Sequence, residues 1–238
     1  MSAPDGVAAV DGGSPMGPAE VWPVLGIRLT TADLLLRPAV GDDVLALGAV
    51  VPDDLELDPA SARFDVTAGA NRRAAIAQGI WRNWGTWTAE SWNLAFTVVH
   101  DGMVVGSQNL EGERFDVVRT VDTSSWLVSS VRGRGFGRQM RSAVLTLAFN
   151  HLGAEAAITA AWRDNHSSLG VSRRLGYTGN GLELHPRLER GETARDEMLH
   201  LRITKQEWVA RDQLPVTVTG VDGCLPYFGA QNLLGPSN

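Results

Sequence analysis

The chain is poor in cysteine: Cys224 is the only one among its 238 residues, so no disulfide can form within it. No stretch approaches the ~20 consecutive apolar residues that a membrane-spanning helix needs. The first residues have neither the basic start nor the apolar run of a signal peptide. These absences argue against a disulfide-stabilised secreted scaffold and an integral membrane protein, and we expect a cytoplasmic protein with no membrane partner.

Positive charge and metal-ligand patterns are also scarce. Lys and Arg number 21 against 27 Asp and Glu, which leaves a formal net charge of -6. Nucleic-acid binding favours a basic surface, so we expect no nucleic-acid partner, although a local anion site is compatible with this charge. The five histidines show no metal-ligand spacing, and one cysteine cannot build a zinc site, so we also expect no metal.

The chain divides into three parts by composition and pattern. Residues 1–20 are rich in Gly, Pro, Ala and Ser and predict a flexible tail. Residues 21–211 predict one domain, and residues 212–238 predict a C-terminal extension that docks on the domain or on a neighbouring subunit, which leaves a homo-oligomer open. Strand patterns lie at 27–37, 92–100, 103–110, 120–128, 154–162 and 199–203, and helical patterns at 41–47, 71–84, 135–152, 165–176 and 204–208. This order, with an antiparallel meander followed by strand–helix repeats, predicts an α/β (α+β) fold with a mixed central sheet and flanking helices.

The densest motif is VRGRGFGRQMR, residues 131–141, between a predicted strand and a predicted helix. Its alternate glycines allow several backbone N–H groups to turn toward one point, and the start of the helix adds partial positive charge. Three arginines add planar donors that match phosphate oxygens: Arg132, Arg134 and Arg138. The motif predicts an anion site, with a glycine-rich turn and solvated arginines as the alternative.

The glycine spacing discriminates between phosphate motifs. A Walker loop needs Gly-Lys-Ser/Thr, which is absent, and a dinucleotide fingerprint needs glycine where Arg138 stands. The pattern Arg/Gln-x-x-Gly-x-Gly/Ala fits Arg132, Gly135 and Gly137, and it resembles the pyrophosphate loop of the GNAT acyltransferases. The segment NHSSLGVSRRLGY, residues 165–177, resembles the Rim-type branch of that family (ribosomal-protein N-terminal acetyltransferases), and VDTSSWL with VSRRLGYTGNGL resembles an actinobacterial subgroup that includes a succinyl-CoA-binding member.

The resemblance implies a GNAT fold with two splayed central strands, 120–128 and 154–162, and an acyl-CoA cosubstrate. It implies that the backbone of Trp126 and Val128 binds the pantetheine arm, and that the N–H of Leu127 or Val128 polarises the thioester carbonyl. The residues that it assigns to the cofactor are Trp126, Leu127, Val128, Arg132, Gly133, Arg134, Gly135, Phe136, Gly137, Arg138, Asn165 and Ser168.

The resemblance also assigns Ser168 as proton donor to the leaving thiolate. The alternatives are a helix cap for Asn165 and an ordinary hydroxyl in the first helical turn for Ser168. Many relatives use a tyrosine where this chain has Ser172, which puts a tyrosine acid in doubt. An amine acceptor must also lose a proton, and the candidate bases are Asp122 and Glu111, with solvated surface carboxylates as the alternative.

The implied activity is transfer of an acyl group from acetyl-CoA or succinyl-CoA to a primary amine, either of a small molecule or of a protein N-terminus. The alternative is a CoA-thioester-binding sensor or subunit with little catalysis. Trp81, Trp84, Trp87 and Trp92 lie within twelve positions and predict either an aromatic wall of the acceptor pocket or ordinary core packing. His100, beside a predicted hairpin turn, is expected to be solvated.

Overall fold

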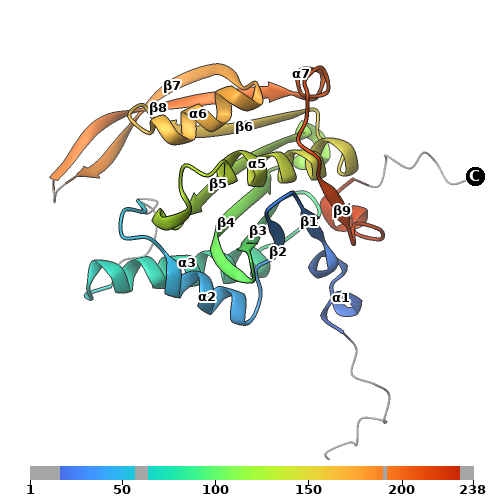
Figure 1. Ribbon diagram of the computed structural model, residues 1–238, viewed down its shortest axis with the longest axis horizontal. Helices are drawn as coiled ribbons and strands as arrows, with labels where there is room; N and C mark the ends of the chain where they lie inside the picture. Colours follow the sequence, from blue (N-terminus) through green and yellow to red (C-terminus); the bar gives the residue numbers. More distant parts are fainter. Residues whose placement is uncertain (1–16, 57–63, 190–191, 231–238) are drawn as a thin grey trace, which may run out of the picture.

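The structure is a computed structural model that describes residues 17–56, 64–189 and 192–230 (Figure 1). Its elements are α1 (Pro18–Val21), η1 (Pro23–Gly26), β1 (Arg28–Thr30), β2 (Leu35–Pro38), α2 (Asp42–Val50), α3 (Ala68–Gly85), β3 (Trp92–His100), β4 (Met103–Gly112), α4 (Phe115–Val118), β5 (Thr120–Leu127), η2 (Ser129–Val131), α5 (Phe136–Thr146), η3 (Leu147–His151), β6 (Ala156–Trp162), α6 (His166–Leu175), β7 (Thr178–Glu189), β8 (Glu192–Thr204), α7 (Lys205–Val209), β9 (Thr217–Thr219) and η4 (Leu225–Phe228). Among these described residues, no helix has the length and apolar content that a membrane crossing requires.

A nine-stranded mixed sheet in the order β7-β8-β6-β5-β4-β3-β2-β1-β9 forms the centre of the molecule. Its β5–β6 pair is parallel and the other pairs are antiparallel. The β3–β4 turn is at Asp101 and Gly102, whose φ angles of 48° and 77° suit a tight hairpin. This arrangement confirms the predicted mixed α/β fold.

The helices cover opposite faces of the sheet (Figure 1). Leu94 and Phe96 of β3 pack into the large core beneath α5 and α6, whereas Ala95, between them, packs with residues of α2 and α3. Successive side chains of a strand point to opposite faces, so the alternation along β3 assigns α5 and α6 to one face and α2 and α3 to the other. Trp126 of β5 packs on the α2–α3 side.

The two parallel strands separate soon after they begin. Backbone pairing between β5 and β6 runs only from Thr120 to Asp122. At the fork, the Thr123 hydroxyl donates to the carbonyl of Ile158 at 3.2 Å, and the Thr159 hydroxyl donates to the carbonyl of Thr123 at 2.8 Å. These side chains replace ladder hydrogen bonds at the point where the strands part, which confirms the expected splay.

The C-terminal extension docks on its own domain as far as the structure describes it. β9 pairs with β1 at the edge of the sheet, and Trp87 donates from Nε1 to the carbonyl of Tyr227 at 2.8 Å. The Phe228 ring meets the Trp92 ring edge-on at a centroid distance of 4.8 Å. Trp87 and Trp92 therefore belong to the core that holds this extension, whereas Trp81 is 57% exposed, so the tryptophans form no single acceptor wall.

Some expected boundaries need correction or lie outside the described residues. Residues 18–20, expected in a flexible tail, belong to α1, and residues 1–16 and 231–238 of the predicted termini lie outside the described residues. The sequence pattern showed only the end of β8 and missed β7. Gly179, Gly181 and Pro186 interrupt its alternation, and β7 tolerates them because it is an edge strand.

Candidate functional site

The glycine loop, residues 132–138, lies where the splayed end of β5 leads into α5. Gly133 and Gly135 have φ angles of +79° and +86°, which side-chain-bearing residues rarely adopt. Within the described part of the chain, the N–H groups of residues 133–137 donate to no protein acceptor. Unpaired N–H groups at the start of an eleven-residue helix have the geometry of an anion cradle, and anion binding at this loop stays a prediction.

Arg134 is held beside this cradle by two rings. Its guanidinium lies 4.8 Å from the centre of the Phe136 ring, and its Nη2 lies 3.4 Å from Nε2 of His100. Nδ1 of His100 lies 2.9 Å from the carbonyl of Asp33, which places a proton on Nδ1, and Nε2 also lies 3.3 Å from Oδ2 of Asp101. The His100 side chain is only 14% exposed, so the expectation that it is solvated was wrong.

Arg132 already has protein partners. Its Nε donates to the carbonyl of Leu127 at 3.0 Å, and both terminal nitrogens donate to the carboxylate of Asp54, with Nη2 at 2.8 Å from Oδ1. Arg132 holds the pKa of Asp54 below its ordinary value. An incoming phosphate would therefore compete with Asp54 for this guanidinium.

Arg138, by contrast, lies near the C-terminal end of α6. It borders a hollow of about 400 Å³ together with Arg174 and Arg211. Its buried Nε has no hydrogen-bond partner among the described residues. The arginines of the motif thus lie in three different environments.

The backbone at the end of β5 corrects part of the expected pantetheine contact. The N–H of Val128 donates to the carbonyl of Val105 in β4 at 2.9 Å, so it is not free to polarise a thioester. In an antiparallel pair, the backbone N–H and C=O groups of every second residue face the partner strand, so those of Trp126 face β4 as those of Val128 do. The two strands approach closely here, since a Cβ on Gly106 would lie 2.2 Å from the Trp126 carbonyl oxygen. Leu127 faces the opposite way, toward the splay, and it remains the candidate N–H donor.

Asn165 and Ser168 begin α6, on the same side of the sheet as the glycine loop. The Asn165 Oδ1 accepts from the N–H of Ser168 at 3.0 Å, so Asn165 is the N-cap. The half-buried Ser168 hydroxyl has no protein partner in the described part of the chain. Ser172 donates its hydroxyl to the carbonyl of Ser168 at 3.1 Å, which ties it to the helix and leaves Ser168 as the available hydroxyl.

The predicted bases lie together on the opposite face. Glu111 and Asp122 are direct partners across β4 and β5, and Glu111 accepts from Nδ2 of Asn93 at 2.7 Å. Both carboxylates reach water, but the surrounding strands remove part of their hydration. This loss of hydration raises the pKa of Asp122. The pKa of Glu111 is raised by the same loss of hydration and, in addition, by the negative charge of Asp122. The structure therefore separates the candidate acid, Ser168, from the candidate bases by the sheet, with the splay between them.

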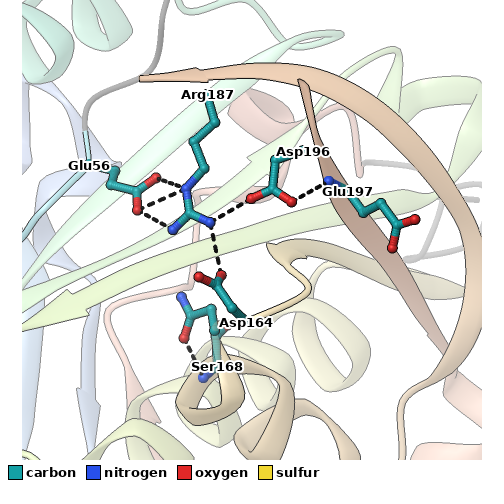
Figure 2. Close-up of polar contacts among 7 residues, drawn as sticks. Glu56, Asp164, Ser168, Arg187, Asp196 and Glu197 are labelled. Atoms are coloured by element: carbon teal, nitrogen blue, oxygen red, sulfur yellow. Dashed lines mark hydrogen bonds and ion pairs between the residues drawn. The ribbon is translucent and has the colours of Figure 1, made fainter. Parts of the chain in front are cut away.

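A cluster around Arg187 was not predicted from the sequence (Figure 2). The Arg187 side chain is 10% exposed and donates to Glu56 at 3.1 Å, to Asp164 at 2.9 Å and to Asp196 at 2.7 Å. Its guanidinium also lies 4.9 Å from the centre of the Trp162 ring. The pKa of Arg187 is raised mainly by its hydrogen bond to Glu56 and further by those to the two aspartates, so Arg187 is a permanent cation.

One short stretch, the acidic segment (residues 53–56), joins this cluster to the glycine loop. Asp54 pairs with Arg132, Glu56 pairs with Arg187, and Asp53 pairs with Arg72 of α3 at 2.6 Å. The connection that follows α2 is therefore fixed both to the loop after β5 and to the β7–β8 hairpin. A pocket of about 510 Å³ lies beside it, lined by Arg163, Asp164, His166, Arg187, Ala194, Arg195 and Asp196.

Comparison with known proteins gives one family and a set of similar structures. Residues 33–178 match the family of acetyltransferase (GNAT) domains. RimJ of Mycobacterium smegmatis, in complex with CoA-disulfide, is similar at a TM-score of 0.59 and 19% identity over 79% of this chain and 95% of that chain. RimL, a ribosomal-protein alpha-N-acetyltransferase, has a TM-score of 0.55 and 17% identity over 73% and 91%. A chimera of the Vibrio cholerae spermidine N-acetyltransferase SpeG and hSSAT has a TM-score of 0.59 and 12% identity over 76% and 100%. At these identities, the likeness is one of fold.

Proposed function

Because this chain belongs to the family of GNAT acetyltransferase domains, we propose that it transfers an acyl group, acetyl or succinyl, from acyl-CoA to a primary amine by direct attack. The observation that carries the proposal is the run of unpaired N–H groups from residue 133 to residue 137 at the start of α5, beside the splay. These donors suit the pyrophosphate of CoA.

The chain's own groups divide the reaction between the two faces of the sheet. The N–H of Leu127 faces the splay and is positioned to stabilise negative charge on the thioester oxygen. Asp122 or Glu111 accepts the proton of the ammonium on the α2–α3 side, and the amine nitrogen then forms a bond to the acyl carbon as the carbon–sulfur bond breaks. As the amide forms, the nitrogen loses its second proton, which restores the proton that Ser168 gives to the departing sulfur from the α6 side; the proton on the carboxylate base returns to solvent.

The acceptor is a primary amine, of a small molecule or of a protein N-terminus. Glu111 and Asp122 place two carboxylates on the face from which the amine would approach, and their charge favours a cation. Similar structures include an acetyltransferase that acts on the α-amino group of a ribosomal protein and one that acts on the small amine spermidine, so both kinds of acceptor occur among them.

The donor is acetyl-CoA or succinyl-CoA, and a succinyl carboxylate needs a cationic or hydrogen-bonding partner. Arg187 is already surrounded by three carboxylates, whereas Arg195, on the same pocket, has no protein partner in the described part of the chain. Competition calorimetry with the two thioesters measures the preference. Tighter binding of succinyl-CoA that disappears in Arg195→Ala would support succinyl transfer, and equal affinities would leave acetyl transfer as the simpler activity.

The loop assignment is tested by Gly135→Glu. Gly135 has a φ of +86° in open space, so glutamate there combines backbone strain with negative charge in the anion cradle. We expect acetyl-CoA binding, measured by calorimetry, to weaken by at least about a hundredfold, or about 2.7 kcal/mol. Gly223→Glu is the matched control, because Gly223 has a φ of +78° in open space far along the chain. Equal binding by both variants would refute the assignment.

Catalysis is tested separately with a panel of amines, acetyl-CoA and a thiol reagent that reports free CoA. Release above background on any amine excludes the alternative of a CoA-binding sensor. Because the pKa of each candidate base is raised, the rate should rise with pH through a value above that of an ordinary carboxyl. Tight CoA binding without thiol release on any amine would favour the sensor.

A further inference from the structure

Three metal-ligating side chains converge on the β7–β8 hairpin, outside the site described above. Glu183 and His185 are two positions apart on β7, so both point to the same face. His200 on β8 pairs with Gly181 across the hairpin, and it joins them on that face. The expectation of no metal rested on spacing along the chain, and strand pairing brings together residues that this spacing separates.

The geometry of the three side chains is close to that of a metal site. Nε2 of His185 lies 3.0 Å from Oε2 of Glu183, and Nε2 of His200 lies 3.5 Å from the same oxygen. One ligand atom from each residue lies within 4.8 Å of the other two. Metal–ligand bonds of ~2.0–2.1 Å in a tetrahedron separate ligand atoms by ~3.3 Å, so small side-chain rotations would complete the set.

An ordinary ion pair explains the arrangement less completely. Glu183 and His185 form a hydrogen bond, but the Nε2 of His200 is buried and has no hydrogen-bond partner among the described residues. A buried polar atom without a hydrogen bond is costly, and this nitrogen lies 3.5 Å from a Glu183 oxygen that His185 already contacts. A cation between the three atoms would satisfy all of them.

We propose that Glu183, His185 and His200 form a binding site for one divalent transition-metal ion, for which Zn²⁺ is the best match. Two imidazoles and one carboxylate are an established zinc donor set, and three protein ligands leave one coordination position open. The side chains of Glu183 and His185 are 63% and 41% exposed, so an ion can enter from solvent and the open position faces water.

The ion would lie on the face that also carries Asp122. His200 pairs with Ala160 of β6, and β6 pairs with β5 at Asp122. Bound zinc would add positive charge to that face and would weaken binding of a cationic amine there. This consequence rests on the proposed function, whereas metal binding itself does not.

The site is tested by calorimetry of Zn²⁺ binding to the full, tag-free chain after treatment with a chelator. We expect one ion per chain, and an affinity at least about tenfold weaker in His185→Ala and in His200→Ala, equivalent to about 1.4 kcal/mol. His151→Ala is the control, because His151 lies at the end of η3 and outside the cluster. Co²⁺ should give a tetrahedral visible absorption spectrum in the wild type that both cluster variants lose.

Thermal unfolding without metal checks that each variant is folded, and His200→Gln replaces His200→Ala if the latter is not. No zinc binding by the wild type, or equal binding by wild type and both cluster variants, would overturn the proposal. Neither result bears on acyl-CoA binding, so the site and the proposed function stand or fall separately.

Discussion

Arg132 and Arg187 are held by the same acidic segment, yet they lie in different environments. Arg132 is 42% exposed and pairs with one carboxylate, that of Asp54, which is 60% exposed. Arg187 is 10% exposed and pairs with Glu56, Asp164 and Asp196. Exposed single pairs contribute little and exchange partners readily, whereas a buried cation among several carboxylates holds its surroundings in place. The comparison indicates an exchangeable contact at the glycine loop and a fixed one at the hairpin.

The largest expected effect follows from removing the fixed contact. In Arg187→Met, three carboxylates lose their shared cation, while methionine fills most of the space of the aliphatic part of the arginine side chain. We expect the free energy of unfolding to fall by about 2 kcal/mol, below the about 3–5 kcal/mol for a fully buried pair because the carboxylates are partly exposed. Urea denaturation measures it. In Arg163→Met, which removes one exposed pair with Glu197, the midpoint should not move; equal midpoints for both variants would contradict a fixed contact.

Acid should reduce the difference in unfolding free energy between the wild type and Arg187→Met. Hydrogen bonding to Arg187 holds the pKa of Asp196 below its ordinary value. The stabilisation is therefore complete above the ordinary value of about 3.9 and is lost as the pH falls through the lowered folded-state value. We expect the gap in unfolding free energy between wild type and Arg187→Met to be similar at about pH 7 and pH 5 and to narrow below about pH 4. A gap that stays constant down to about pH 3 would show that the carboxylates do not contribute through their charge.

The smallest effect concerns the exchangeable contact. In Asp54→Asn, Arg132 loses its carboxylate partner and becomes available to a phosphate. We expect CoA to bind up to about fivefold more tightly, as befits an exposed pair of up to about 1 kcal/mol. Calorimetry with CoA measures it, and Glu56→Gln should leave that affinity unchanged because Glu56 pairs with Arg187. Unchanged or weaker binding in Asp54→Asn would mean that Asp54 orders the loop and does not compete with the ligand.

The sequence predicted those parts of the molecule that depend on local patterns. The glycine loop and the N-cap at Asn165 follow from the spacing of a few residues, and the helix predicted at 204–208 begins with a capping box of Thr204 and Glu207. The meander followed from apolar alternation, whereas the splay of β5 and β6 was expected only from the family resemblance. In the glycine loop, the helix caps and the meander, backbone geometry is set by residues close together in the chain.

The rest depends on contacts between distant residues. Glu56 and Arg187 are 131 positions apart, and their pairing requires the register of a hairpin whose first strand is interrupted by Pro186. The direction of the Val128 N–H likewise depends on its register against β4, which no local pattern specifies. The cluster of Glu183, His185 and His200 was hidden for the same reason.

The aromatic contact between the C-terminal extension and the core can form only late in the synthesis of the protein. Trp87 and Tyr227 are 140 positions apart, so at about 5–20 residues per second the ribosome takes about 7–28 s to pass from one to the other. During that time, the rings of Trp87 and Trp92 lack the cover that Phe228 later gives them. A nascent chain would therefore present an aromatic surface to chaperones until the extension emerges and closes the domain.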